Sequence, residues 1–180
     1  MTFCKIENSR VHLRILEQRD VVPMVEWMHD ESVVKDLQTD FMHKTLEDCE
    51  HFISASLTDE QNIHLAIVDS TEQYLGTVSL KNIHDSTAEF AITIRASAMG
   101  KGIAKEAMEM MIGKGFDEIG LSSIYWCVSP DNKRAVRFYD KNGYHRVSPD
   151  VLKIGNEYSQ EQIQKYIWYR VTKEDCQNRI

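Results

Sequence analysis

A glycine turn between a strand-like and a helix-like segment is the feature that most constrains this chain. The strand-like segment ends with Ile92, Thr93 and Ile94, and the turn Met99-Gly100-Lys101-Gly102 runs directly into the helix-like start Ile103-Ala104-Lys105. Glycine removes side chains where backbone N–H groups converge, and a helix N-terminus adds a partial positive charge. The stretch therefore predicts an anion cradle for a diphosphate.

Positive charge surrounds this turn in the sequence. No acidic residue occurs between Ile92 and Glu106, and basic residues stand beside the turn and in a later segment: Arg95, Lys101, Lys105, Lys133, Arg134 and Arg137. The chain as a whole carries a formal net charge of −7, whereas a general nucleic-acid binder needs a basic face. We therefore expect a small phosphate-containing ligand and no nucleic-acid partner.

Two common phosphate-binding motifs do not fit the turn. A dinucleotide-binding fingerprint needs a third glycine at the position of Lys105. A P-loop around Gly113-Lys114 would need Ser or Thr where Gly115 stands, and a glycine where Met108 stands.

The remaining pattern, Gln/Arg-x-x-Gly-x-Gly/Ala, resembles the acetyl-CoA loop of the GNAT N-acetyltransferases. Gly102 and Ala104 satisfy it, while Met99 departs from the usual Gln or Arg. That loop holds phosphate largely through main-chain N–H groups, so the departure affects the resemblance only modestly.

A second segment, residues 130–144, is similar to the other GNAT signature, Asn-x-x-Ala-x-x-Phe-Tyr-x-x-x-Gly-Phe/Tyr. The matching residues are Asn132, Ala135, Phe138, Tyr139, Gly143 and Tyr144. Asp131 or Asn132 can cap this helix and Gly143 can end it. Both motifs occur in the family's order, separated by one helix and one strand, and the resemblance covers nearly the whole chain.

Hydrophobic periodicity predicts an alternation of strands and helices in the order β-α-α-β-β-β-α-β-α-β-β. The expected strands are 11–15, 63–67, 74–80, 90–94, 124–128, 144–147 and 166–171; the expected helices start at a cap on Asp20, at Thr45, after Gly102 and after Asn132. Polar connections are expected at 69–73 and 82–87, and a long irregular loop at 148–164. This is the GNAT order, so we expect an α/β fold with a mixed central sheet of about seven strands and helices on both faces.

Composition bounds the remaining possibilities. The 180 residues, 42% of them hydrophobic, suffice for the core of one domain, so 1–180 is interpreted as a single domain. The N-terminus lacks the layout of a signal peptide, and no apolar run reaches membrane-spanning length. The four cysteines and seven histidines show no ligand-like spacing. We expect a cytoplasmic protein with no metal and no membrane partner.

The resemblance implies direct transfer of an acetyl group from acetyl-CoA to a primary amine. In that family the strand before the loop, here Ile92 to Ile94, pairs its backbone with the pantetheine arm, and a strand N–H polarises the thioester carbonyl. We add Asn132 to the expected coenzyme-binding residues. The family tyrosine maps onto Tyr139, which would protonate or hydrogen-bond the departing thiolate.

The amine must lose a proton before it attacks, because its pKa is about 10.4. Glu89, which opens the strand that leads into the loop, is the candidate base, acting directly or through water. The competing interpretation is a solvent-facing carboxylate at a strand start. His64 and His84 are reserve candidates.

The acceptor is sought among the N-terminal helices and the loop before the last strand. Candidate residues are Trp27, Met28, Asp30, Asp40, Phe41, Met42 and His43, with Tyr158 opposite. The segment is similar to enzymes that acetylate amino sugars on nucleotide carriers, which is the first expectation. Ribosomal-protein N-terminal, polyamine and aminoglycoside acetyltransferases are alternatives, as is a non-catalytic acetyl-CoA-binding module. Either a monomer or a homodimer is compatible with the sequence.

Overall fold

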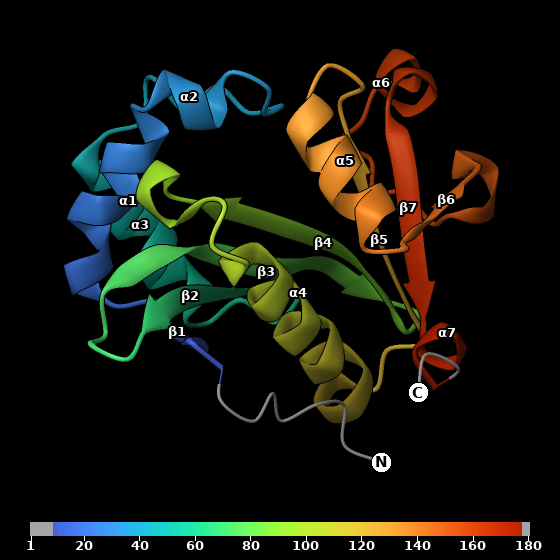
Figure 1. Cartoon of the computed structure of the whole chain (residues 1–180), viewed down its shortest axis with the longest axis horizontal. Coiled ribbons are helices and arrows are strands. Elements are labelled where there is room, and N and C mark those ends of the chain that lie inside the picture. Colours follow the sequence, from blue (N-terminus) through green and yellow to red (C-terminus); the bar gives the residue numbers. More distant parts are fainter. Residues whose placement is uncertain (1–8, 178–180) are drawn as a thin grey trace.

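Seven β-strands form one mixed sheet in the computed structural model, which describes residues 9–177 (Figure 1). The strands are β1 (Val11–Ile15), β2 (Ile63–Asp69), β3 (Tyr74–His84), β4 (Thr87–Ile94), β5 (Ser123–Val128), β6 (His145–Val147) and β7 (Ile167–Thr172). Their order across the sheet is β1-β2-β3-β4-β5-β7-β6. Neighbouring strands are antiparallel except β4 and β5, which are parallel. The mixed sheet confirms the predicted fold class.

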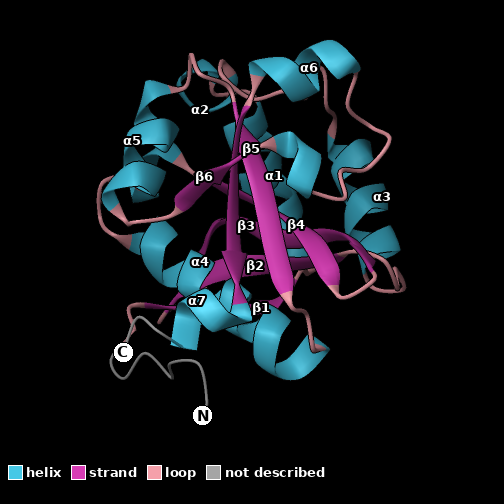
Figure 2. Ribbon diagram, turned by 90° about the vertical axis from the view of Figure 1, so that its right-hand side faces the viewer, coloured by secondary structure: helices cyan, strands magenta, loops and turns pink. Residues whose placement is uncertain are grey.

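Helices cover both faces of this sheet, as expected (Figure 2). They are α1 (Val21–Met28), α2 (Glu31–Val34), α3 (Leu46–Ser56), α4 (Ile103–Lys114), α5 (Lys133–Lys141), α6 (Gln160–Lys165) and α7 (Lys173–Gln177). On one face Trp27 and Ile53 pack with Ala66 in a core built by α1 to α3. On the other, Met108 of α4 and Tyr139 of α5 belong to the larger core. Met108 and Met111 of α4 are buried in this core, and Met110 packs against it.

Helix starts follow local capping chemistry, with one correction. Thr45 caps α3 and forms a capping box with Asp48, as the predicted start requires. Asp20 stands at the N-cap position of α1, but its side chain caps nothing there. Its carboxylate is 1% exposed and accepts two hydrogen bonds from the guanidinium of Arg14, at 2.7 and 2.8 Å. Leaving a buried carboxylate without a charged partner costs more free energy than leaving this helix start without a side-chain cap.

The stretch 148–164 is only in part the irregular loop that the sequence predicts. It contains a 3-10 turn at Pro149–Val151 and the first residues of α6. Ser159 and Gln162 form a capping box at the start of α6, a Ser-x-x-Gln signature visible in the sequence. The short helices α2 and α7 are also absent from the predicted order.

The β3–β4 hairpin is tighter than expected. β3 continues to His84, and the turn narrows to Asp85 and Ser86, whose φ angles are 46° and 59°. Two central residues with positive φ form the turn type that suits the twist of a hairpin. The polar stretch 82–87 therefore lies mostly within the strands.

β4 and β5 pair along only a short length and then separate. The parallel ladder covers Thr87, Ala88 and Glu89 against residues 123–125, although β4 continues to Ile94 and β5 to Val128. Figure 1 shows the two strands diverging, with α1 to α3 beside β4 and α5 beside β5. The separation begins directly after Glu89. We call it the split.

Three cysteines lie within residues 9–177. Cys49 and Cys176 are buried and Cys127 is half-buried. No helix in this range is both long and apolar enough to cross a bilayer. Cys4 lies outside the described residues.

Candidate active site

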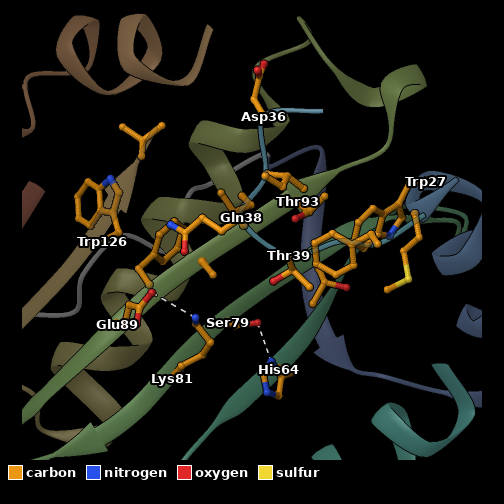
Figure 3. Close-up of a pocket in the computed structure, with 18 of the residues that line it drawn as sticks. Trp27, Asp36, Gln38, Thr39, His64, Ser79, Lys81, Glu89, Thr93 and Trp126 are labelled. Atoms are coloured by element: carbon orange, nitrogen blue, oxygen red, sulfur yellow. Dashed lines mark hydrogen bonds and ion pairs between the residues drawn. The ribbon is translucent and has the colours of Figure 1, made fainter. Parts of the chain in front are cut away.

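A cavity of about 470 Å³ lies at the split. Its walls come from β2 to β5, from α1, α3 and α5, from the segment 36–41 and from Tyr158. Figure 3 shows Glu89 and Trp126 on one side of it and Trp27 on the other, with Gln38 and Thr39 between them. A mostly apolar cavity with a few polar groups is the usual form of a small-molecule site.

The backbone of β4 presents unpaired groups to this cavity. The N–H of Arg95 donates to the carbonyl of Leu75 at 2.9 Å. Because hydrogen-bonded and non-bonded pairs alternate in an antiparallel ladder, the main chain of Thr93 also faces β3, whereas that of Ile92 and Ile94 faces the split. Ile92 and Thr93 line the cavity, but Thr93 reaches it only through its side chain. Of the predicted stretch, Ile92 and Ile94 are placed to pair with an extended ligand.

The loop 99–105, which we call the cradle loop, has the geometry of an anion site. Gly100 and Gly102 have φ angles of 73° and 79°, in the left-handed region that favours glycine. A Cβ at Gly100 would meet nothing within 4 Å, whereas a Cβ at Gly102 would lie 2.7 Å from Nη2 of Arg10. Helix α4 begins at Ile103. The open space and the helix start fit a phosphate group.

Arg10 was not anticipated from the sequence. Its Nε donates to Oε1 of Glu106 at 2.9 Å and its backbone N–H to Oε2 at 3.0 Å, which holds the guanidinium beside Gly102. No local pattern could have identified it, because it stands far upstream, directly before β1.

Of the other basic residues predicted near the turn, some contact acidic residues elsewhere instead of the cradle loop. Arg95 does not join the cradle loop: its guanidinium contacts Glu26 of α1 and the carbonyl of Tyr74. Lys105 pairs with Glu109 at 3.1 Å. Arg134 does approach the loop, with Nη1 2.8 Å from Sδ of Met99.

In three of the predicted coenzyme-binding residues, some groups are buried or already hydrogen-bonded and so cannot contact a ligand. The side chains of Ile94 and Ile103 are buried in the core, so only their main-chain groups are available to a ligand. Asn132 lines the cavity, but its Oδ1 accepts the N–H of Ala135 at 3.1 Å as the cap of α5. Ala104 is half-buried, and Lys101 is exposed.

Glu89 lies on the cavity wall and is 3% exposed. Its Oε1 accepts from Nζ of Lys81 at 3.2 Å and from the hydroxyl of Tyr158, while Oε2 is buried and accepts from no donor among the described residues. The carboxyl of Glu157 is in hydrogen-bond contact with that of Glu89. Burial raises the pKa of Glu89, and Lys81 and Tyr158 offset part of that rise. The interpretation of Glu89 as a solvent-facing carboxylate is wrong.

Tyr139 also lines the cavity and is 8% exposed. Its ring packs against Trp126 and Tyr169, with centroids 5.3 and 5.1 Å away. Burial raises the pKa of the phenol, so the hydroxyl keeps its proton at neutral pH. Tyr139 and Glu89 therefore approach one cavity from α5 and β4.

The expected acceptor residues divide into two groups. Trp27, Met28, Phe41 and Tyr158 line the cavity, whereas Asp30, Asp40, Met42 and His43 do not. Trp27 also has a packing role, because its indole N–H donates to the hydroxyl of Tyr74 at 3.0 Å. The residues missed there include Asp36 and Gln38, on a segment without a periodic pattern.

The two reserve histidines also differ. His64 lines the cavity, accepts or donates one hydrogen bond with Ser79 at 2.7 Å, and has a pKa lowered by burial. His84 is exposed at the far end of β3, outside the cavity. No group of three metal-ligating side chains occurs among residues 9–177.

Comparison with known proteins gives the family. Residues 10–145 match the acetyltransferase (GNAT) domain family, and the chain belongs to that family. Spermidine N(1)-acetyltransferase of Escherichia coli K12 is 28% identical over 74% of this chain and 72% of its own length. Aminoglycoside N(6')-acetyltransferase type 1 of Klebsiella pneumoniae is 21% identical over 77% and 76%.

A solved structure shares the fold. Spermidine N-acetyltransferase from Vibrio cholerae in complex with CoA and spermine has a TM-score of 0.78 at 20% identity, over 95% of this chain and all of that one. The family membership makes this chain an acetyl-CoA-dependent N-acetyltransferase.

Proposed function

We propose that this enzyme acetylates a primary amine of a small polyamine, with Glu89 as the general base and Tyr139 as the general acid. One observation carries the proposal: the Glu89 carboxylate is buried on the cavity wall where β4 and β5 separate, and burial raises its pKa. A buried carboxylate takes up a proton more readily than an exposed one, and the amine supplies that proton.

Glu89 takes the amine proton directly or through water. A protonated amine has a pKa of about 10.4 and cannot attack. The raised pKa of Glu89 makes it a better proton acceptor than an ordinary carboxylate.

The coenzyme is held by the cradle loop and by the main chain of Ile92 and Ile94. When bound, acetyl-CoA supplies the thioester that the amine attacks. The Ile92 N–H, which faces the split, polarises the carbonyl oxygen where negative charge grows. Tyr139 then donates its proton to the departing sulfur. Because a thiol has a pKa of about 8.5, this donation helps without being indispensable.

The acceptor class follows from charge and from the relatives. Asp36, Asp48 and Glu89 line the cavity against Lys44 and Lys81, and Lys81 is paired with Glu89. The cavity lining thus has one more carboxylate than ammonium group, and together with the net charge of −7 of the chain this attracts a polycation. The relatives named for spermidine and aminoglycosides act on such amines, whereas no comparison supports the nucleotide-linked amino sugar, which stays a prediction.

The acceptor class is tested by thiol release from acetyl-CoA with a panel of amines. The panel contains spermidine, spermine, an aminoglycoside, a nucleotide-linked amino sugar and an N-terminal peptide. We expect the highest kcat/KM for the polyamines. Turnover of the amino sugar or the peptide with none for the polyamines would reject the proposal.

A matched pair of variants locates the charge recognition. Asp36→Asn removes a carboxylate from the cavity wall, whereas Asp40→Asn removes an exposed one outside it. Only Asp36→Asn should raise KM for a polyamine. Equal effects of the two variants would indicate a diffuse surface attraction instead.

A further inference from the structure

Residues 153–158, which we call the crossing segment, tie the two halves of the sheet together at the closed end of the split. Lys153 pairs with Asp85 of the β3–β4 turn at 3.0 Å, and its carbonyl accepts the hydroxyl of Tyr125 at 2.9 Å. Oε1 of Glu157 accepts from Nδ2 of Asn82 at 2.5 Å. The segment therefore contacts β3, β5 and the turn between β3 and β4.

Tyr158 is the residue of the crossing segment that reaches the cavity. Its ring is half-buried against Trp168 and Tyr166, with centroids 5.3 and 6.5 Å away. Its hydroxyl contacts Sγ of Cys127 at 3.6 Å and donates to Oε1 of Glu89. These contacts from three sides give the hydroxyl one fixed position.

The two oxygens of Glu89 are therefore in different situations. Oε1 accepts from both Tyr158 and Lys81, whereas Oε2 is buried and accepts from no donor among the described residues. The carboxyl of Glu157 is in hydrogen-bond contact with that of Glu89. Two donors on one oxygen fix the rotation of a carboxylate, which otherwise turns broadly about its last torsion.

We propose that Tyr158 is a positioning residue, whose hydroxyl holds Oε1 of Glu89 and so fixes the orientation of this carboxylate at the cavity wall. The proposal rests on the proposed role of Glu89 as the base.

The groups around Glu89 determine in which direction its pKa, and with it the acid limb of the pH–rate profile, moves when the Tyr158 hydroxyl is removed. It is faced by Lys81 of β3, by Glu157 and Tyr158 of the crossing segment, and by Tyr125 and Cys127 of β5. Among these, Tyr158 and Lys81 lower the pKa of Glu89 and Glu157 raises it. Without the Tyr158 hydroxyl the pKa rises further. Since a base works when deprotonated, the acid limb of the pH–rate profile moves to higher pH.

Tyr158→Phe tests this while keeping the ring. We expect kcat to fall about tenfold, the acid limb to move up by about one pH unit, and the affinity for CoA to stay unchanged. The matched control is Tyr166→Phe, which alters the ring neighbour of Tyr158 but not a donor to Glu89. An acid limb and kcat equal to the wild type in Tyr158→Phe would overturn the proposal.

Two further measurements keep the test decisive. A ring-fluorinated tyrosine at position 158 keeps the shape and strengthens the donor, so the acid limb should move to lower pH; an unmoved limb counts against the proposal even if Tyr158→Phe fails to fold. Glu89→Gln distinguishes a failure of the proposed role of Glu89 as the base from a failure of the positioning role of Tyr158. If it keeps wild-type turnover, Glu89 is not the base and both proposals fail; if it loses turnover while Tyr158→Phe does not, only the positioning role fails.

Discussion

Arg134 of α5 reaches across the split to the cradle loop, with its Nη1 2.8 Å from Sδ of Met99. Met99 stands where the sequence pattern resembling the acetyl-CoA loop usually has Gln or Arg. A thioether is a weak hydrogen-bond acceptor, so the exposed guanidinium can exchange it for a phosphate oxygen at little cost. We therefore expect Arg134 to supply the charge that position 99 lacks.

Replacing Arg134 by Met should therefore weaken CoA binding several-fold, because one charge-assisted contact to phosphate is lost. Calorimetric titration with CoA measures this, and pantetheine, which has no phosphate, should show no change. Arg137→Met on the same helix is the control and should bind CoA as the wild type does. Adding Met99→Arg to Arg134→Met should restore affinity. A CoA affinity unchanged in Arg134→Met would mean that the diphosphate lies elsewhere.

Gly102→Ala should lower CoA affinity, in addition to the loss of stability expected for an alanine at a left-handed position. The left-handed backbone costs an alanine about 1–2 kcal/mol, and the new Cβ would displace the guanidinium of Arg10. Gly120→Ala is the matched control, because Gly120 has a φ of 82° and open space around it, away from the cradle loop. Both variants should lose similar thermal stability, but only Gly102→Ala should lose CoA affinity. Equal losses of CoA affinity in the two variants would show that backbone strain alone, and not a changed cradle loop, causes the loss.

Tyr139→Phe should lower turnover and leave CoA affinity nearly unchanged. The ring contacts with Trp126 and Tyr169 remain, so folding is preserved. Loss of a general acid costs up to about 10²-fold to 10⁴-fold, and a thiol of pKa about 8.5 places the loss at the low end. Steady-state kinetics and calorimetry on the same preparation separate the two quantities. Unaltered turnover would make Tyr139 a packing residue.

The wild-type pH–rate profile should have its acid limb above the range of an exposed glutamate. Burial raises the pKa of Glu89, so the carboxylate becomes protonated, and inactive as a base, at a higher pH than usual. The measurement is kcat for a polyamine between pH 4 and 9 (about the range in which the carboxylate titrates). A limb at the ordinary glutamate value would contradict the assignment.

Much of the fold was predictable because its signals are local. The alternation in Val11–Ile15 and the Thr45–Asp48 capping box depend on neighbouring residues alone, as does the turn at Gly100 and Gly102. The start of α6 was equally local, and its Ser159–Gln162 capping box was overlooked.

The missed parts of the site depend on contacts between distant segments. Arg10 reaches the cradle loop only through Glu106, and Lys81 meets Glu89 only through the register of β3 against β4. Arg95 lies near the cradle loop in the sequence, but its guanidinium contacts the carboxylate of Glu26 on α1 instead, because proximity in sequence does not determine the direction of a side chain.

The most direct test of the account is the turnover of Glu89→Gln with acetyl-CoA and a polyamine. The substitution keeps the shape of the side chain and removes the proton acceptor, so kcat should fall by about 10²-fold to 10⁴-fold, while calorimetry shows CoA affinity equal to the wild type. A Glu89→Gln enzyme that turns over at the wild-type rate would contradict the account, because the buried carboxylate at the split would then have no part in the reaction.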